Sequence, residues 1–261
     1  MIQDFNLHTH TSRCGHAVGT DDEYVEAAIK AGYKFLGFAD HAPYKGISRA
    51  RARMDWEMLD DYLTNMQRVK EKYADQIEIR IGFESEYYPE WLEERRELLS
   101  KVDYMLFGQH FESPYIRPYA EYFKHNTDEE ILHYARMVCE GLETGIYTYL
   151  CHPDVFLNNQ DEFTAACAEA AHMISATAAK TGIPMELNAR GVQKGRQPFK
   201  AGQRYFYPHR EFWEIASQYP IRCLFGIDAH DPRDILDVRA VELAYEEVKD
   251  LPLTYVGNPL K

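Results

Sequence analysis

Short apolar runs alternate along the chain with longer stretches whose apolar residues recur at helical spacing. The apolar runs predict seven strands, over residues 4–8, 34–39, 77–84, 104–109, 148–151, 184–188 and 222–227. The amphipathic stretches predict seven helices, near residues 21–31, 55–74, 90–100, 127–144, 160–181, 209–218 and 234–249. This alternation predicts parallel strands joined by right-handed crossovers. It does not by itself distinguish a closed barrel from an open, doubly wound sheet.

Several helix ends carry local signals. Gly32 and Gly182 follow the first and fifth helices, where a glycine in the left-handed region is a common C-cap. The expected N-caps are Asp21 or Asp22 for the first helix, and Thr127, with Glu130 three residues on, for the fourth. Gly141 lies inside the fourth helix and weakens the prediction for its last turn. Residues 42–54 and 189–208 are expected to form long loops.

The chain has 261 residues, which suits one large α/β domain. Apolar residues make up 45% and charged residues 27%, as in ordinary globular proteins. The formal net charge of −13 argues against nucleic acid as a partner, because binding to phosphate backbones needs a basic surface. It does not exclude a small anionic substrate beside a metal cluster. No apolar run is long enough to predict a membrane span.

The cysteine pattern points to a reducing compartment. The five cysteines form no Cys-x-x-Cys pair, and their odd number argues against a disulfide scaffold or a thiolate zinc site. The N-terminal residues do not show a basic region followed by an apolar stretch, so no secretory signal is expected. A cytoplasmic location is therefore predicted.

Metal-ligand residues follow six of the seven predicted strands. They are His8 and His10, with His16 in the next loop, Asp40 and His41, Glu84, His110, His152, and Asp228 and His230. In a parallel α/β barrel the carboxyl ends of all strands point to one mouth, so these residues are expected to meet in space. The His-x-His motif alone is a weak signal. The informative observation is that His, Asp or Glu recurs at the ends of six predicted strands.

Seven of the 11 histidines belong to this group. Packing so many imidazoles and carboxylates together is costly unless each finds a partner, and divalent metal supplies one for all of them. Imidazole and carboxylate ligands together suit Mn, Fe or Zn, and the number of ligands suits two to three ions. The remaining histidines are interpreted as ordinary surface or core residues; they are His125, His133, His172 and His209.

Six short motifs carry a family resemblance. They are His8-Thr9-His10, Ala39-Asp40-His41, Gly82-Phe83-Glu84, Gly108-Gln109-His110, Cys151-His152-Pro153 and Gly226-Ile227-Asp228-Ala229-His230. As an ordered set covering nearly the whole chain, they resemble the polymerase and histidinol phosphatase (PHP) family. The resemblance implies a single domain over residues 1–261, folded as a distorted (β/α)7 barrel that holds a trinuclear metal centre.

The resemblance also implies how the ligands are divided. The first metal would bind His8, His10, Glu84 and Asp228; the second would share Glu84 and add His110 and His152; the third would bind His16, His41 and His230. Asp40 would support a ligand. The chain has no room for a polymerase or nuclease appendage, which favours the branch that hydrolyses L-histidinol phosphate in histidine biosynthesis.

The mechanism implied is attack on phosphorus by a hydroxide that bridges two metals. Asp228, Glu84 and His230 are the candidate catalytic residues, and the general acid stays unassigned. Arg190 and Arg196 are candidate phosphate-binding residues, since arginine matches phosphate bidentately; Arg49, Arg51 and Arg53 are weaker candidates. Glu86, Glu112 and Tyr115 are candidates for the substrate amine and imidazole. Cys14 and Cys151 are interpreted as packing residues.

Other functions remain open at this stage. The same ligand set serves a phosphoesterase acting on a nucleotide, a phosphodiester or phosphotyrosine. A non-catalytic metal-binding barrel is a second alternative, although structural metal sites usually need few ligands and leave no open position. An amidohydrolase-like barrel is a third, and His16, His41 and His230 fit it less well.

Overall fold

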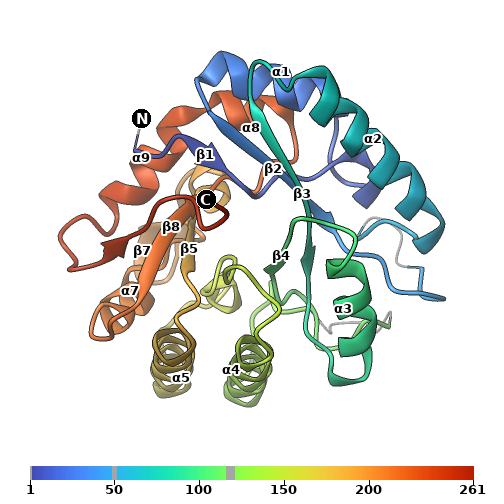
Figure 1. The fold of residues 1–261 in the computed structure, drawn as a ribbon. Helices are drawn as coiled ribbons and strands as arrows, with labels where there is room; N and C mark the ends of the chain where they lie inside the picture. The colour runs from blue at the N-terminus through green and yellow to red at the C-terminus, as the bar shows by residue number, and fades with distance from the viewer. Residues whose placement is uncertain (1, 49–51, 116–120) are drawn as a thin grey trace.

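Seven parallel strand segments form a ring in the computed structural model, which describes residues 2–48, 52–115 and 121–261 (Figure 1). The named strands of the ring are β1 (Phe5–Asn6), β2 (Phe35–His41), β3 (Glu78–Ser85), β4 (Tyr104–Phe107), β5 (Met185–Asn188) and β8 (Arg222–Gly226). The first four pair in chain order, and β5 pairs with β8. Leu150 supplies the seventh position, since it bridges Phe107 of β4 and Met185 of β5 in parallel.

The ring closes between its first and last strands. Thr9 pairs with Ala229, and the Ala229 amide donates to the His8 carbonyl over 3.1 Å. Farther down this seam side chains replace the ladder: the Asn6 amide oxygen accepts from the backbone of Ile227 over 3.0 Å. The barrel is distorted at this seam, because a few backbone hydrogen bonds and side-chain contacts close it in place of a continuous strand ladder. The predicted distorted (β/α)7 barrel is confirmed, and the open doubly wound sheet is excluded.

Helices surround the ring on its outside (Figure 1). They are α1 (Asp21–Ala31), α2 (Leu59–Lys72), α3 (Leu92–Leu99), α4 (Asp128–Glu143), α5 (Ala165–Thr181), α7 (Arg210–Ala216), α8 (Pro232–Leu236) and α9 (Val238–Glu246). Short 3-10 helices are η1 (Ser12–Cys14), η2 (Trp56–Met58), η3 (Pro89–Trp91) and η4 (Val155–Leu157). None of the helices in the described part of the chain combines the length and the apolar character needed to cross a membrane.

Apolar side chains fill two separate layers. One cluster lies inside the ring and includes Phe5, Leu7 and Tyr104; Val256 and Leu260 of the C-terminal segment pack against it. Figure 1 accordingly shows the C-terminus near the centre of the ring. The larger cluster lies between the strands and the surrounding helices. The strands are buried on both faces, which explains their nearly continuous apolar sequences.

Tyr104 crosses the inside of the ring and ties opposite strands together. Its hydroxyl donates to the carbonyl of Leu7 over 2.6 Å and lies 3.0 Å from that of Phe38. The aromatic side chain of Tyr104 passes so close to Gly82 that a Cβ at position 82 would lie 2.6 Å from Tyr104 Cε1. A side chain at position 82 would therefore displace the tyrosine.

The first helix is capped by a residue that the sequence did not single out. Thr20 is the N-cap: its side chain accepts from the Glu23 amide over 3.2 Å, and Glu23 Oε2 accepts from the Thr20 amide over 2.7 Å. Asp21 and Asp22 lie in the first turn instead, so the expectation that one of them is the cap is wrong. The caps expected at Gly32, Gly182 and Thr127 are confirmed.

Three segment predictions need correction. The last helix is broken at Asp237, whose ψ of 68° is not helical, so α8 and α9 replace the single expected helix. The fifth helix starts at Ala165, behind the cap residue Thr164, rather than near residue 160. The segment expected as a loop over 189–208 contains α6 (Arg190–Gln193) and a hairpin of β6 (Gln197–Phe199) and β7 (Gly202–Arg204). One further strand, β9 (Thr254–Tyr255) near the C-terminus, pairs with β8.

Gly141 lies inside α4 for a packing reason, and this yields a prediction with a definite sign. A Cβ at this position would lie 2.3 Å from Phe107 Cζ. Gly141→Ala should therefore lower the free energy of unfolding by about 1–3 kcal/mol, although alanine favours a helix by about 1 kcal/mol. Urea denaturation followed by circular dichroism measures the difference. The exposed neighbour change Glu140→Ala should stay within about 0.5 kcal/mol; a stabilised Gly141→Ala would contradict the packing argument.

Candidate metal centre

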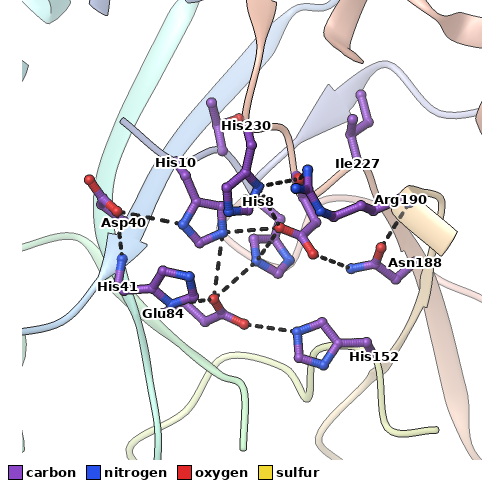
Figure 2. Close-up of polar contacts among 12 residues, drawn as sticks. His8, His10, Asp40, His41, Glu84, His152, Asn188, Arg190, Ile227 and His230 are labelled. Atoms are coloured by element: carbon purple, nitrogen blue, oxygen red, sulfur yellow. Dashed lines mark hydrogen bonds and ion pairs between the residues drawn. The ribbon is translucent and has the colours of Figure 1, made fainter. Parts of the chain in front are cut away.

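The predicted ligands gather at the carboxyl ends of the strands. Figure 2 shows the imidazoles of His8, His10, His41 and His152 turned toward the carboxylate of Glu84. Except for His41, which is partly buried, and His16, which is exposed, the predicted ligands are buried. Residues 222 positions apart in sequence are thus brought into one cluster by the parallel barrel, as the strand-end pattern predicted.

One oxygen of Glu84 faces the first group of ligands. Glu84 Oε2 lies 3.5 Å from His8 Nε2 and 3.5 Å from His10 Nε2. Asp228 Oδ1 lies 3.1 Å from His10 Nε2 and 3.7 Å from His8 Nε2. Two imidazole nitrogens and two carboxylate oxygens therefore surround one small space.

The other oxygen of Glu84 faces a second group. Glu84 Oε1 lies 3.0 Å from His152 Nε2 and 3.2 Å from His110 Nε2. These two Nε2 atoms lie 3.3 Å from each other. Glu84 thus presents a separate oxygen to each of two adjacent spaces, as a carboxylate that bridges two cations does.

A third group lies nearer the mouth. The Nε2 atoms of His16 and His230 face each other at 3.0 Å, and His41 completes a set whose ligand atoms lie within 4.8 Å of one another. His41 Nδ1 also lies 3.1 Å from Glu84 Oε2. The third group is therefore contiguous with the other two.

Unpaired buried atoms test whether cations fit this cluster. His8 Nε2, His10 Nε2 and Glu84 Oε2 are all buried and have no hydrogen-bond partner within residues 2–48, 52–115 and 121–261. Buried polar atoms are rarely left in this state, since each costs roughly 1–3 kcal/mol. Convergent imidazole and carboxylate lone pairs are the ligands that divalent transition metals take. Divalent metal ions fit this donor set.

The histidines of the cluster differ in protonation. Burial opposes the charged form of both His8 and His110, but nearby acidic groups raise the pKa of His8 and bring that of His110 to about 10. Burial lowers the pKa of His10 to about 4 and that of His230 to about 3, and it holds the pKa of His41 well below its ordinary value. These imidazoles are neutral at neutral pH and offer a lone pair. Burial opposes ionisation of Glu84 and Asp228, but the neighbouring histidines outweigh it and hold both carboxyl pKa values well below normal.

A second layer of polar groups orients the ligands. Glu186 Oε1 lies 2.8 Å from His8 Nδ1, and Glu186 Oε2 accepts from the His152 amide over 3.1 Å and from Asn188 over 2.8 Å. Glu186 was missed in the sequence; the available signal was a lone acidic residue within an apolar strand. Asp40 has the supporting place that was expected, since its carboxylate accepts from the His41 amide over 2.8 Å and lies 3.6 Å from His10 Nδ1.

Two of the predicted ligands have an unusual backbone conformation. His152 has φ 27° and Asp228 has φ 54°, and they are the non-glycine residues with positive φ in the described chain. Such conformations cost of order 1–3 kcal/mol each and persist where surrounding contacts fix them. Both residues follow strand ends, where the strain turns their side chains into the cluster.

A cavity of about 230 Å³ opens above the cluster. Its walls are His16, His41, Ala52, His110, Phe111, Phe123, His152, Arg190, Lys194, Tyr207, Asp228 and His230. The lining therefore combines two cationic side chains, three aromatic rings and several of the predicted metal ligands. This volume suits a small metabolite rather than a polymer.

Of the two predicted phosphate-binding arginines, the structure brings one to the cavity. Arg190 Nη1 donates to the Asp228 carbonyl over 3.1 Å. Arg196 points elsewhere: its guanidinium lies 2.5 Å from Glu247 and 4.4 Å from the Tyr205 ring. Lys194 lines the cavity in its place, because residues 190 and 194 are one helical turn apart on α6 and its C-cap.

Of the other candidates for substrate contacts, those that the structure describes do not line the cavity. Arg49 and Arg51 lie outside the described residues, and Arg53 and Glu86 are buried against each other at 3.1 Å. Glu112 and Tyr115 are exposed and do not line this cavity.

The cysteines near the cluster are packing residues. Cys14 and Cys151 are fully buried, and burial raises the pKa of both thiols. A buried, protonated thiol is a poor nucleophile. This agrees with the expectation from sequence.

The family model of the PHP domain matches residues 6–190, more than half of the chain. The chain belongs to the PHP family. A protein of Deinococcus radiodurans named "Probable histidinol-phosphatase" is 28% identical over 236 residues, which cover 87% of this chain and 86% of that protein. The Bacillus subtilis protein named "Histidinol-phosphatase" is 30% identical over 106 residues, covering 36% of this chain and 37% of that protein.

A solved structure has the same fold. It is the histidinol phosphate phosphatase of Lactococcus lactis subsp. lactis Il1403, complexed with zinc, L-histidinol and phosphate. The two share a TM-score of 0.76 with 15% sequence identity, over 100% of this chain and 99% of that one. At this identity the likeness establishes the barrel fold.

Metal removal should destabilise the protein. Without cations, the buried charges of Glu84 and Asp228 lose their partners, and ions at 1,000 times their dissociation constant contribute about 4 kcal/mol. Calorimetry should give a lower Tm in a chelator, restored by Zn²⁺ or Mn²⁺. Glu84→Gln, which removes the shared ligand, should respond much less to the chelator. An unchanged wild-type Tm, with no metal found by mass spectrometry, would contradict the assignment.

Proposed function

We propose that this protein is a metal-dependent phosphomonoesterase that hydrolyses L-histidinol phosphate to L-histidinol and phosphate in histidine biosynthesis. The observation that carries the proposal is a buried cluster of histidines and carboxylates that forms the floor of a small cavity, with Arg190 and Lys194 on one wall. Family membership and the names of the relatives support the same reaction. The expected partner is this small substrate rather than nucleic acid.

The metals are proposed to number two to three and to be Mn, Fe or Zn. The ligand sets proposed are His8, His10, Glu84 and Asp228; Glu84, His110 and His152; and His16, His41 and His230. Bound there, divalent ions supply positive charge to phosphoryl oxygens and make a water-derived nucleophile available near neutral pH. The neutral imidazoles of His10, His41 and His230 and the ionised carboxylates of Glu84 and Asp228 offer lone pairs to these ions.

Arg190 is proposed to bind the phosphoryl group. One guanidinium nitrogen is held by the Asp228 carbonyl, which fixes the group at the cavity wall. Lys194 adds a second positive charge on the same wall. Two cations beside the floor provide the electrostatic stabilisation that charge on a transferring phosphoryl group needs.

The aromatic part of the lining suits the organic half of the substrate. Phe123 lies parallel to the His110 ring, with centroids 5.6 Å apart and an interplanar angle of 17°. Phe111 and Ala52 also belong to the lining. A flat, partly apolar ring such as imidazole packs well against such a surface.

Asp228, Glu84 and His230 are proposed as the residues closest to the reaction. Asp228 and His230 line the cavity that Arg190 lines, so they face a bound phosphoryl group. His230 Nδ1 lies 3.2 Å from Asp228 Oδ1, so the two side chains are direct neighbours at the cavity.

The proposal treats residues 1–261 as one domain. The family match ends at residue 190, but Tyr207, Asp228 and His230 of the following segment line the cavity. The site is therefore built from both parts. A cytoplasmic location is also proposed, since the five cysteines are free, as expected in a reducing compartment.

The direct test is phosphate release from L-histidinol phosphate by the Mn-, Fe- or Zn-loaded protein. We expect kcat/KM above about 10⁴ M⁻¹s⁻¹, the lower edge of ordinary enzyme efficiency, with strong preference over simple phosphomonoesters and a phosphodiester. Weak, unselective turnover would retain a metal phosphoesterase and reject the substrate. No turnover of any phosphoester by fully loaded protein would favour a non-catalytic barrel.

The roles of the two arginines give a matched pair of variants. Arg190→Ala should raise KM for the phosphoester by roughly tenfold or more, since a charge-assisted hydrogen bond contributes about 1.5–3 kcal/mol, while metal content stays unchanged. Arg196→Ala removes the same side chain from an exposed pair with Glu247 and should leave KM within about twofold. Steady-state kinetics and elemental analysis measure both. Equal effects of the two changes would remove Arg190 from the proposed site.

A further inference from the structure

Arg53 is a buried cation beside the metal cluster. It is 2% exposed, and its guanidinium carbon lies 4.6 Å from the centre of the Tyr44 ring and 5.9 Å from that of Phe111. Its Nη2 donates to Glu86 Oε1 over 3.1 Å. Its Nε and Nη1 have no hydrogen-bond partner among the residues that the structure describes. A buried ion pair seldom gains net stability over apolar packing, so this one calls for another explanation.

Glu86 connects this cation to a proposed metal ligand. The oxygen that accepts from Arg53 also lies 3.3 Å from His110 Nδ1. The other oxygen accepts from the Tyr44 hydroxyl over 3.3 Å, so both oxygens are engaged. The backbone carbonyl of Glu86 is fixed as well, since it accepts from the Tyr147 hydroxyl over 3.1 Å. Glu86 is therefore held in place and turned away from the substrate cavity.

The contact with Glu86 determines which ring nitrogen of His110 is available to a metal. An imidazole whose Nδ1–H donates a hydrogen bond to a carboxylate keeps the lone pair of Nε2 free for a metal. His110 Nε2 faces Glu84 Oε1 at 3.2 Å, on the side of the ring opposite Glu86.

We propose that Arg53 and Glu86 form a buried positioning pair that fixes the ring orientation and the tautomer of His110 for metal binding. The proposal rests on the metal centre that the proposed function assigns. It also links that centre to the lining of the substrate cavity, because Ala52, next to Arg53 in the chain, and Phe111, which Arg53 faces, both line the cavity. Glu86 is thus a positioning residue rather than the contact for the substrate amine that the sequence suggested.

The chain offers a matched control in Arg95. This arginine is fully buried and lies 4.0 Å from the same Tyr44 ring. It donates to the Pro43 carbonyl over 2.7 Å, to Ser85 Oγ over 3.4 Å and to Glu94 Oε1 over 2.5 Å. None of these partners is a proposed ligand. Arg53→Lys and Arg95→Lys are therefore the same change at the same depth, and only the first alters the contact with Glu86.

The experiment measures Co²⁺ binding to the metal-free full chain, without substrate. Arg53→Lys should lose about 10- to 100-fold in affinity for one ion per chain and should change the visible Co²⁺ spectrum of that site. Arg95→Lys should bind Co²⁺ with wild-type affinity and spectrum, whatever its loss in Tm. His110→Ala gives the spectrum expected when this ligand is absent.

Glu86→Gln keeps the test decisive if Arg53→Lys does not fold. This nearly isosteric change should reproduce the same loss of affinity and the same spectral change. Wild-type affinity and spectrum in folded Arg53→Lys or Glu86→Gln would overturn the proposal, and so would an equal loss in Arg95→Lys. Because no substrate is used, a wrong substrate assignment leaves the result intact. Absence of Co²⁺ binding by the wild type would overturn the metal centre itself.

Discussion

The buried carboxylate of Glu84 is the group on which the site depends. Five imidazoles lie within 3.5 Å of its two oxygens, those of His8, His10, His41, His110 and His152. Leaving such a carboxylate without a cation costs about 3–5 kcal/mol when a buried pair is broken. With divalent ions in both adjacent spaces, the same arrangement satisfies every lone pair at once. The unpaired atoms, the strained residues His152 and Asp228 and the supporting carboxylates all follow from this requirement.

The barrel brings the residues of this cluster together. Parallel strands deliver their ends to one mouth, and the seam between β1 and β8 brings His8 and Asp228 within 3.7 Å. Interior packing holds the ring rigid below the site, with Tyr104 tied to Leu7 next to His8. A second layer then orients individual ligands: Glu186 holds His8, and Glu86, itself held by Arg53, holds His110. The proposed phosphate-binding groups come from α6 and its C-cap, which follow the end of β5, as functional groups of such barrels usually follow strand ends.

The positions of the strands and the clustering of the candidate ligands were predictable from sequence, because apolar runs mark strands and most of the candidates lie at the ends of such runs. Features set by tertiary contacts were not. Lys194 rather than Arg196 reaches the cavity because residues 190–193 form a helix that the sequence suggested as a loop. Glu86 alternates with Glu84 along the chain, yet only the structure reveals that Arg53 and Tyr44 engage its carboxylate. The break of the last helix at Asp237 likewise has no local breaker residue to announce it.

Anomalous diffraction from crystals of the metal-loaded protein tests the central claim most directly. Data collected on both sides of the zinc or manganese edge locate each ion without reference to activity. The account predicts strong peaks on both sides of Glu84, each within bonding distance of one of its oxygens and of the imidazole nitrogens around it. A third peak is expected among His16, His41 and His230. Water or hydrogen-bonded imidazoles in these spaces, with no anomalous signal at full metal loading, would contradict the account.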